Sequence, residues 1–407
     1  MGSAPEDSAS MTWDVIIVGA GPAGAATAAT LASLGERVLL VDAHTSPRAT
    51  LGESLPPIAI GLVNHFLGEA LAHEHNRGCA FRTSGNVSLW ATEQADVKDF
   101  FFTATGFGLC VDRRAFDEAL RTRAVAVGAT LQKGLRFESC VALMGSDANW
   151  EVSLRSAKQL VNYRARYLVD CSGRGAVVAK ALGVPIIGQT DNLFAYAQWF
   201  SLDAEDDDRY TRLEASQDGW WYSNRLPTTE KNQTTRLVVF HCDKDLPQAK
   251  AAANQSGFNQ LLSSSAHIGP LLKAKGYQSR GAIRGSPANS QRLATFCGDG
   301  WLAVGDSAQA YDPLSSQGID KALRAGSQAG HMIHYALRDS PHNPSGLGAT
   351  NSFIERYEQQ QQQLWQTYVS QLNFYYRQQT RWAEHPFWQR RHKHQHHLSL
   401  SARQLAT

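Results

Sequence analysis

Long apolar runs, paired cysteines and a surplus of charge are all missing from this chain of 407 residues. No stretch approaches the roughly 18 consecutive apolar residues that a membrane-spanning helix requires. The 39 basic and 37 acidic residues nearly balance, so the formal net charge is only +2. A charge this small gives no general attraction to nucleic acid or to an anionic membrane surface. We therefore expect neither nucleic acid nor a membrane among the partners of this chain.

Cysteine is sparse, and no two cysteines form a C-x-x-C pair. The six residues are Cys79, Cys110, Cys140, Cys171, Cys242 and Cys297. In a chain of this length, such scattered cysteines indicate reduced thiols rather than a disulfide framework. The N-terminal "MGSAPEDSAS" also lacks the basic region and apolar core of a signal peptide. Both observations predict a cytoplasmic protein.

A metal site is not indicated either. The C-terminal "HPFWQRRHKHQHH" is rich in histidine, but no acidic or cysteine partner stands beside it. We interpret this stretch as a solvated tail and predict no bound metal.

One glycine motif is present, and it appears once. "VIIVGAGPAGAATAATLASLGERVLLVD" contains Gly19, Gly21 and Gly24 in the spacing G-x-G-x-x-G, between an apolar strand and an alanine-rich helix. Asp42 follows the next apolar strand, where its carboxylate can accept hydrogen bonds from a ribose. This order predicts a dinucleotide site with its pyrophosphate at the helix N-terminus. The motif does not choose between FAD and NAD(P), and no second motif indicates a separate NAD(P)H domain.

Two distant segments repeat the pattern of an apolar strand that ends in an acid. "YLVDCSGRGAVVAKAL" places Asp170 after a strand and before a small-residue turn. "WLAVGDSAQAYDPLSSQGIDKALRAG" places Asp306 after a strand, followed by a loop with Pro313 and a helix that begins at Gly318. An acid in this position is suited to holding a polyhydroxyl chain. A helix start with free N–H groups is suited to the edge of a flavin ring.

These segments together resemble the FAD-dependent monooxygenases and halogenases with the p-hydroxybenzoate-hydroxylase-like fold. The resemblance implies FAD as the cofactor, with Asp306 on its ribityl chain. It places the loop that contains Pro313, Gln317 and Gly318 beside the isoalloxazine. "VDRRAFDEAL" resembles the arginine-bearing helix start of this family, which implies that Arg113 lies near the FAD phosphates and ribityl chain. A surface salt bridge is the alternative for Arg113.

The halogenase-like branch of this family shows further similarities. "GESLPP" resembles its flavin-adjacent loop and includes Glu53 and Ser54. "DPLSSQG" resembles its Asp-Pro flavin loop, and "GWWYSNRLP" is similar to its tryptophan-rich strand. The stretch "FYYRQQTRWAEHPFWQRR" resembles its C-terminal tail. In this order, the similarities cover most of the chain.

A lysine that this resemblance would require is missing. Tryptophan halogenases carry active chlorine on a lysine about two dozen residues after the Gly-Glu loop, but residues 51–97 contain no lysine. Trp220 and Trp221 are also adjacent, and Leu226 precedes Pro227 where halogenases have Ile-Pro. The pattern is most similar to flavoproteins of the LodB, GoxB and QhpG type. This similarity implies hydroxylation of a tryptophan in a partner protein during tryptophylquinone cofactor biogenesis.

The implied partners follow from the same resemblance. The protein substrate would be a precursor quinoprotein, either an amine or amino-acid oxidase or a dehydrogenase, and O2 would be the second substrate. Electrons would come from NAD(P)H or from a separate reductase. Two alternatives stay open: a flavin-dependent hydroxylase or halogenase of a small or carrier-bound aromatic, and a flavin-binding assembly factor without turnover.

Aromatic side chains on one strand are the candidates for holding an indole. Trp220, Trp221 and Tyr222 are consecutive, so Trp220 and Tyr222 share one face of a strand and Trp221 takes the other. At least one of the three is therefore expected to fill the core. Glu53 is the candidate acid–base residue, with a backbone-capping or solvent-facing glutamate as the alternative. His241, at the end of the strand "RLVVFH", is the second catalytic candidate and is expected to point into the substrate cavity.

The predicted fold is α/β: a Rossmann-like FAD-binding domain with an inserted antiparallel-sheet substrate domain and a helical C-terminal region. The FAD-binding domain would be discontinuous, with strand-like alternation in the inserted segments. We predict residues 10–60, 105–185 and 285–340 for the FAD-binding domain, 61–104 and 186–284 for the substrate domain, and 341–407 for the helical region.

Overall fold

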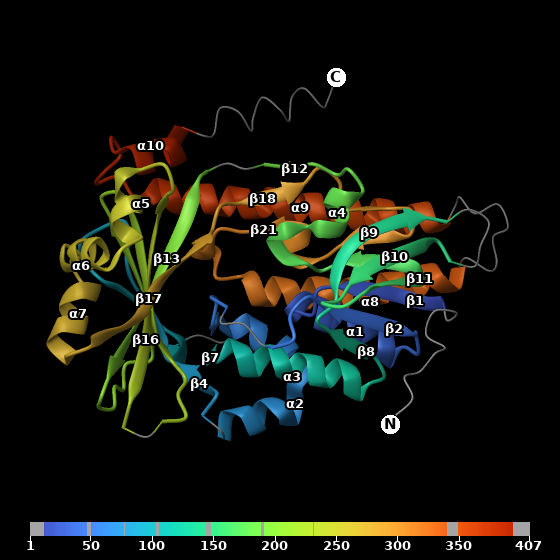
Figure 1. Ribbon diagram of the computed structural model, residues 1–407. Helices are drawn as coiled ribbons and strands as arrows, with labels where there is room; N and C mark the ends of the chain where they lie inside the picture. Colours follow the sequence, from blue (N-terminus) through green and yellow to red (C-terminus); the bar gives the residue numbers. More distant parts are fainter. Residues whose placement is uncertain are drawn as a thin grey trace.

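The computed structural model describes residues 12–46, 50–76, 78–102, 106–143, 148–188, 191–230, 232–339 and 349–393. Strand β1 (Thr12–Val18) lies at the centre of a parallel sheet, between β2 (Val38–Asp42) and β11 (Leu160–Asp170) (Figure 1). β8 (Thr130–Lys133) extends this sheet beyond β2, and β20 (Trp301–Ala303) extends it beyond β11. The apolar end of β1 is buried on both faces, as expected for a central parallel strand.

Antiparallel strands complete this sheet beside β11 and β20. β10 (Trp150–Arg155) pairs with β11 and with β9 (Arg136–Ala142), and β19 (Cys297–Gly298) pairs with β20. The short helix α4 (Val177–Ala181) contacts β9. The parallel strands thus carry the dinucleotide motif, and the antiparallel strands extend the sheet on which it lies.

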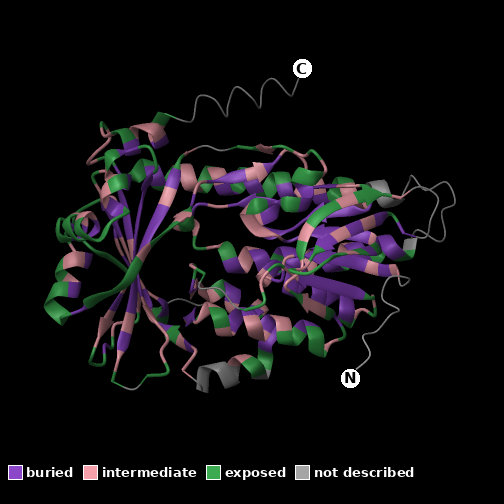
Figure 2. Ribbon diagram, in the orientation of Figure 1, coloured by how far each residue is buried: buried purple, intermediate pink, exposed green. Residues whose placement is uncertain are grey.

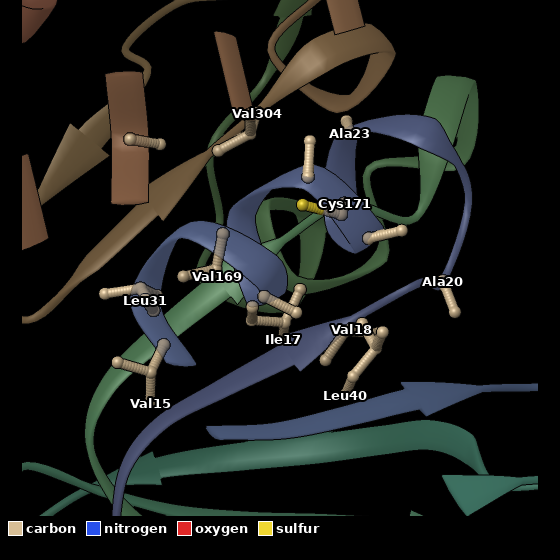
Figure 3. Close-up of a cluster of buried hydrophobic side chains, with 14 of the residues drawn as sticks. Val15, Ile17, Val18, Ala20, Ala23, Leu31, Leu40, Val169, Cys171 and Val304 are labelled. Carbon is tan, nitrogen blue, oxygen red and sulfur yellow. The ribbon is translucent and has the colours of Figure 1, made fainter. Parts of the chain in front are cut away.

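A layer of helices packs on the parallel strands. α1 (Pro22–Ser33) contacts both α3 (Arg113–Ala126) and α8 (Gly318–Asp339). Its alanines are almost all buried, which lets the neighbouring helix approach closely. Figure 3 shows this core, to which Ala23 and Leu31 of α1, Ile17 of β1, Leu40 of β2 and Val169 of β11 contribute.

The other half is built on a large, mostly antiparallel sheet (Figure 1). Only β14 and β5 pair in parallel within it. Most of its strands are buried, whereas β17 is exposed along most of its length (Figure 2). The strand order is β17 (Gln278–Pro287), β13 (Leu193–Leu202), β16 (Thr234–Asp243), β15 (Gly219–Leu226), β14 (Tyr210–Ser216), β5 (Gly85–Leu89) and β6 (Asp96–Asp99).

Helices cover both faces of the large sheet. On one face lie α5 (Pro247–Ala252), α6 (Gln255–Ser263) and α7 (Ile268–Lys275), over a buried cluster. On the other face lie the C-terminal part of α9 (Ala349–Gln378) and α10 (Pro386–Lys393). α9 also contacts α8 and β19, so it runs from the parallel sheet to the large sheet (Figure 1).

Short elements line the junction of the two halves. β7 pairs with both β3 and β4, and β18 pairs with both β12 and β21. α2 contacts α3 and β4. The bounds are β3 (Ser54–Leu55), β4 (Ala80–Thr83), β7 (Gly108–Val111), β12 (Ile186–Ile187), β18 (Gln291–Leu293), β21 (Gln309–Ala310) and α2 (Ile60–Asn76).

The predicted α/β class with mixed and antiparallel sheets and a helical C-terminus is confirmed. Segment 61–104 is shared between the halves: α2 packs on α3, whereas β5 and β6 join the large sheet. The six cysteines all fall within the described segments, and none of them forms a disulfide there. No helix in those segments is long and apolar enough to cross a bilayer. Part of the predicted helical region, residues 341–348 and 394–407, lies outside them.

Candidate functional site

The glycine turn after β1 leaves no room for a side chain at two of its positions. Gly19 has a φ of +105°, and a Cβ there would lie 2.3 Å from the carbonyl oxygen of Cys171. A Cβ on Gly24 would lie 1.9 Å from the carbonyl oxygen of Gly19. Gly21, which precedes α1, faces open space instead, because a Cβ at this position would have no atom within 4 Å. The N-terminus of α1 is thus open to an anionic ligand.

Asp42 stands beside this turn at the end of β2. Its Oδ2 accepts a hydrogen bond of 3.2 Å from the Ala20 amide, and its Oδ1 accepts one of 2.8 Å from the His44 amide. A guanidinium nitrogen of Arg121 lies 3.9 Å from Oδ2. The carboxylate is therefore fixed next to the open helix N-terminus, where the predicted contact with a ribose requires it.

The other two strand-end acids have different surroundings. Asp170 is fully buried, and its Oδ2 accepts hydrogen bonds of 2.9 and 3.0 Å from the amides of Val178 and Ala179. It therefore caps α4 and does not face a ligand. The Asp306 side chain is 42% exposed, and its Oδ1 accepts a hydrogen bond of 2.8 Å from Lys321 Nζ. Of the two acids, only Asp306 is accessible to a polyhydroxyl chain.

The loop before α8 has one buried anchor and an open outer surface. Asp312 is fully buried, whereas Pro313 and Gly318 are exposed and Gln317 is half-buried. Nothing lies within 4 Å of the position that a Cβ on Gly318 would take. Ser316 has a φ of +50°, which turns the chain into the helix. The predicted flavin loop thus presents an accessible helix start, as a flavin edge requires.

Arg113 fixes the "GESLPP" loop rather than projecting freely. Its Nη1 donates hydrogen bonds of 2.8 and 3.0 Å to the carbonyl oxygens of Leu51 and Gly52. Its Nε and Nη2 each donate at 3.1 Å to the carboxylate of Asp117, one turn further along α3. Ser54 lies in the same loop, with its hydroxyl 3.4 Å from the Thr211 hydroxyl of the large sheet. Arg113 therefore joins the loop to α3 at the junction of the halves.

Glu53 and Tyr222 meet across this junction. The Tyr222 hydroxyl donates a hydrogen bond of 2.5 Å to Glu53 Oε1, and the Gly52 amide lies 3.1 Å from Oε2. Burial raises the pKa of Glu53, and the hydrogen bond from Tyr222 partly offsets this shift. Burial and the neighbouring Glu53 charge raise the pKa of Tyr222 well above its usual value. A buried carboxyl group with a raised pKa is a candidate for proton transfer.

The three aromatic residues of β15 fall on two faces. Trp221 is buried against Phe240 and Phe258, beneath α6, on the face away from Tyr222. Trp220 is fully buried on the same face as Tyr222, in the cluster formed with α9 and α10. Of the three candidates for substrate contact, Tyr222 is the one whose polar atom reaches the "GESLPP" loop.

His241 belongs to the aromatic cluster and not to an open cavity. Its ring stacks on Trp220 with a centroid distance of 3.7 Å and an interplanar angle of 10°. Burial lowers the pKa of His241 to about 3, so the ring is uncharged at neutral pH. Nδ1 has no hydrogen-bond partner among the described residues. These surroundings fit a packing role better than the predicted position in the substrate cavity.

A cavity of about 440 Å³ opens between the "GESLPP" loop, the start of α3 and the large sheet. Its walls include Glu53 and Arg113 from the first half, and Trp199, Leu226 and Pro227 from the large sheet. The wall therefore brings together two predicted site residues and the end of the tryptophan-rich strand.

Arginines form the outer rim of this cavity. Arg114 at the start of α3 and Arg280 and Arg284 on β17 are exposed, and none has an ion pair among the described residues. The Arg284 guanidinium lies 5.2 Å from the Trp199 ring centroid. Asp112, which also lines the cavity, accepts amide hydrogen bonds at the start of α3. The rim is thus positively charged, although the chain as a whole is nearly neutral.

A family model described as an FAD binding domain matches residues 12–369 of this chain. The chain belongs to this FAD-binding family. Its cofactor is FAD, and it is an FAD-dependent oxidoreductase. The open N-termini of α1 and α8 and the accessible Asp306 fit the pyrophosphate, ring edge and ribityl chain of this cofactor.

Curated relatives of this chain include an oxidoreductase and halogenases. LodB of Marinomonas mediterranea, named as an FAD-dependent oxidoreductase, is 28% identical over 394 residues, or 94% of this chain and 97% of the relative. A chlorinase of pyrrole-2-carbonyl groups on a peptidyl carrier protein, from Pseudomonas fluorescens, is 24% identical over 82% of this chain and 78% of the relative.

Solved structures show the same fold at lower identity. The myxobacterial chondrochloren halogenase CndH superimposes with a TM-score of 0.78 at 22% identity, covering 97% of this chain and 90% of that one. The peptidyl tryptophan dihydroxylase QhpG superimposes with a TM-score of 0.69 at 23% identity, covering 94% and 79%.

Several buried partners could not be deduced from the FAD-family motifs. Asp117 holds Arg113, Lys321 holds Asp306, and Tyr376 of α9 donates a hydrogen bond of 2.7 Å to Asp312. Of these three contacts, only the Arg113–Asp117 pair could be expected from the sequence, because residues four apart lie on one face of a helix. Lys321 and Tyr376 reach their partners through packing, which no local spacing encodes.

Proposed function

We propose that this chain is an FAD-dependent monooxygenase that hydroxylates a tryptophan residue of a partner protein during tryptophylquinone cofactor biogenesis. The observation that carries the proposal is the chemistry of the cavity wall. It contains the Glu53 carboxyl group held by Tyr222, and no lysine among the described residues that line it. A wall without an amine to carry active halogen, but with a positioned proton acceptor, favours insertion of oxygen.

The similarity to two relatives also supports hydroxylation. QhpG is described as a peptidyl tryptophan dihydroxylase essential for tryptophylquinone biogenesis, and it shares the fold over 94% of this chain. LodB is similar over nearly the whole length of both chains. Residues 51–97 contain no lysine, and neither do the described residues that line the cavity. Both observations favour hydroxylation over halogenation.

The residues of this chain would act by placement and proton transfer. Bound FAD supplies the oxidative chemistry with O2 after it has been reduced. Tyr222 fixes Glu53 through Oε1, and Glu53 takes up the proton that the aromatic carbon loses when it is oxygenated. Trp199, Leu226 and Pro227 give the apolar walls against which an indole packs and from which water is excluded.

The position of the cavity supports a protein substrate. One of its walls is the exposed strand β17, so an extended peptide can reach it from outside. Arg280 and Arg284 at this edge, which form no ion pair within the described part of the chain, favour an acidic segment in the partner. We propose a precursor quinoprotein as that partner, with electrons from NAD(P)H or from a separate reductase.

Mass spectrometry of the partner tests the proposal. The FAD-loaded chain is incubated with a precursor quinoprotein, a reductant and ¹⁸O-labelled O2. We expect the mass of one or two labelled oxygen atoms on one tryptophan of the precursor. A precursor with phenylalanine at that tryptophan serves as the control and should gain no mass. Complex formation without a mass change would instead support an assembly factor.

A halogenase acting on a small or carrier-bound aromatic is the second candidate, favoured by the similarity to the carrier-protein chlorinase. The same reaction with chloride or bromide and a free or carrier-bound pyrrole distinguishes the two. A halogenated product, with an unchanged precursor quinoprotein, would contradict the proposed hydroxylation.

A further inference from the structure

Lys321 brings an amino group next to Asp306, the acid that is accessible to the ribityl chain. It lies on the first turn of α8, and its side chain is only 11% exposed. Its Nζ donates a hydrogen bond of 2.8 Å to Asp306 Oδ1 and another to the carbonyl oxygen of Gln309. The same nitrogen lies 4.0 Å from the centroid of the Tyr311 ring. All three contacts are with the segment that leads into the flavin loop.

These contacts fit the charged form of Lys321. An ammonium group has three N–H donors and no acceptor. A carboxylate, a carbonyl oxygen and the negative face of an aromatic ring here surround the nitrogen. Burial lowers the pKa of Lys321, and the Asp306 charge acts in the opposite direction. Lys321 is therefore a positive charge held inside the protein by one carboxylate.

Packing fixes the residues that surround this ammonium group. The Tyr311 ring stacks on Tyr368 of α9 with a centroid distance of 3.8 Å and an interplanar angle of 2°. Its hydroxyl donates a hydrogen bond of 3.2 Å to Gln309 Oε1. Gln309 Nε2 in turn donates one of 3.2 Å to the carbonyl oxygen of Gln361, also on α9. The position of Lys321 Nζ thus depends on a rigid cage and not on the ion pair alone.

Arg174, before α4, is a second cation close to this cage. Burial lowers the pKa of its guanidinium, and the Asp306 charge acts in the opposite direction. Asp191 and Asp312 are further acids whose charges reach Arg174. Several charges thus act together near the flavin loop. Among them, Lys321 and Asp306 form a contact whose two ends can be changed one at a time.

The two ends of this contact differ in their access to a ligand. The Asp306 side chain is 42% exposed, whereas that of Lys321 is nearly buried. Asp306 can therefore contact bound FAD directly. Lys321 can act on the cofactor only through Asp306 and through its own charge, which solvent screens little because the side chain is buried.

We propose that Lys321 is a positioning residue for bound FAD and that its charge makes the flavin easier to reduce. It holds the Asp306 carboxylate in place for the ribityl chain. Reduction adds two electrons and one proton to the neutral oxidised ring, so the ring gains a negative charge that a nearby ammonium group stabilises. The inference rests on FAD binding and needs no part of the proposed tryptophan hydroxylation.

The midpoint potential of bound FAD tests this inference without a partner protein or turnover. The FAD-loaded chain is reduced with dithionite in the absence of oxygen, in equilibrium with a reference dye. Lys321→Met keeps a long, unbranched side chain but removes the charge. We expect the equilibrium constant for reduction to fall at least about tenfold, which is about 30 mV for two electrons. Lys321→Arg keeps the charge and should restore most of the difference.

Asp306→Asn makes the opposite charge change at the other end of the same contact. It removes the negative charge with little change in size, so the equilibrium constant for reduction should rise. A purely structural ion pair would behave differently, because both substitutions would loosen the same contact and move the potential in one direction or not at all. Flavin titration gives a second readout, in which both Lys321→Met and Asp306→Asn should bind oxidised FAD more weakly.

Arg324→Met is the matched control on the same helix. Arg324 is 49% exposed and pairs with Asp320 at 2.9 Å. Its loss removes the same charge where water and salt screen it, so the potential should equal that of the wild type. A wild-type potential in Lys321→Met, or shifts of the same sign in Lys321→Met and Asp306→Asn, would overturn the inference. If Lys321→Met does not retain FAD, Asp306→Asn decides: a higher potential supports the inference, and an equal or lower one overturns it.

Discussion

Gly21 and Gly24 stand one helical turn apart but meet very different surroundings. A Cβ at 24 would overlap the carbonyl oxygen of Gly19, whereas a Cβ at 21 would meet no protein atom. Gly24 is needed by the fold. Gly21 is needed only if a ligand occupies the space next to it. Substitution of Gly24 should therefore affect folding, whereas substitution of Gly21 should affect cofactor binding.

We expect Gly24→Ala to destabilise the chain by at least about 2 kcal/mol, because backbone must move to admit the methyl group. Gly21→Ala should change the stability of the FAD-free protein by less than about 1 kcal/mol. It should nevertheless weaken FAD binding at least about tenfold, since the methyl group enters the pyrophosphate side of α1. Thermal unfolding and flavin titration measure the two effects. Normal FAD affinity in Gly21→Ala would place the cofactor elsewhere.

The Glu53–Tyr222 pair is the second feature that acts at this scale. Tyr222→Phe removes the hydrogen bond that partly offsets the raised pKa of Glu53, so this pKa should rise further. If Glu53 acts as a base, activity is lost as the pH falls through its pKa. The acidic limb of the pH–rate profile should therefore move to higher pH in Tyr222→Phe, with a rate loss on the order of 100-fold.

Glu53→Gln should lose the acidic limb together with most of the rate. Trp221→Phe supplies the control, because Trp221 lies on the opposite face of β15 under α6. It should lower stability without moving the limb. A limb that stays in place in both Tyr222→Phe and Glu53→Gln would assign the proton transfer to another group.

At the scale of elements, β17 is unusual because it combines exposure with positive charge. It closes one edge of the large sheet, and Arg280 and Arg284 face the mouth of the cavity. Charges at the rim of an interface mainly accelerate association and set its salt dependence. Under the proposed function, β17 would guide an acidic partner segment to the cavity.

The double variant Arg280→Glu/Arg284→Glu should reduce the association rate with a precursor quinoprotein at least about tenfold at low salt. The difference from the wild type should shrink as salt is raised, because exposed charges are screened. FAD content should stay normal. Arg164→Glu, an exposed charge reversal on β11, is the matched control and should bind like the wild type. Equal association rates for the wild type and the double variant would rule out this role.

The same strands show which features the sequence could predict. Val15–Val18, the glycine turn and the alternation of β15 follow from local patterns, because pleat and helix periods are local properties. The partner of Tyr222 lies 169 residues away along the chain, and that of Tyr376 lies 64 residues away. No local period encodes such distances. The flavin-loop anchor and the arginine rim therefore emerged only from the packing of the halves.

On the scale of the whole molecule, α9 and α10 connect the FAD-binding half with the large sheet. Tyr357 of α9 donates a hydrogen bond to β20, and Arg391 of α10 donates one of 2.8 Å to Asp243 at the end of β16. A helical C-terminus was predictable from its composition, but its surfaces of attachment were not. These buried contacts therefore fix the position of the flavin loop relative to the large sheet.

The Asp243–Arg391 ion pair is the contact whose loss should affect the whole molecule most. Asp243 is fully buried and Arg391 is 6% exposed. Asp243→Asn leaves the Arg391 charge without its carboxylate, and we expect a loss of about 3–5 kcal/mol. Denaturant unfolding followed by tryptophan fluorescence measures this loss, because Trp388 of α10 and Trp220 are both buried in the same cluster.

The double variant Asp243→Leu/Arg391→Met decides whether the charges themselves matter. An apolar pair of similar volume avoids the unpaired charge, so the loss should be much smaller than that of Asp243→Asn alone. Arg390, which also contacts Asp243 but is 37% exposed, keeps its second partner Asp245 and should contribute little. If the double variant were as unstable as the single one, the attachment of α10 would depend on the hydrogen-bond geometry of the ion pair and not on the avoidance of an unpaired charge.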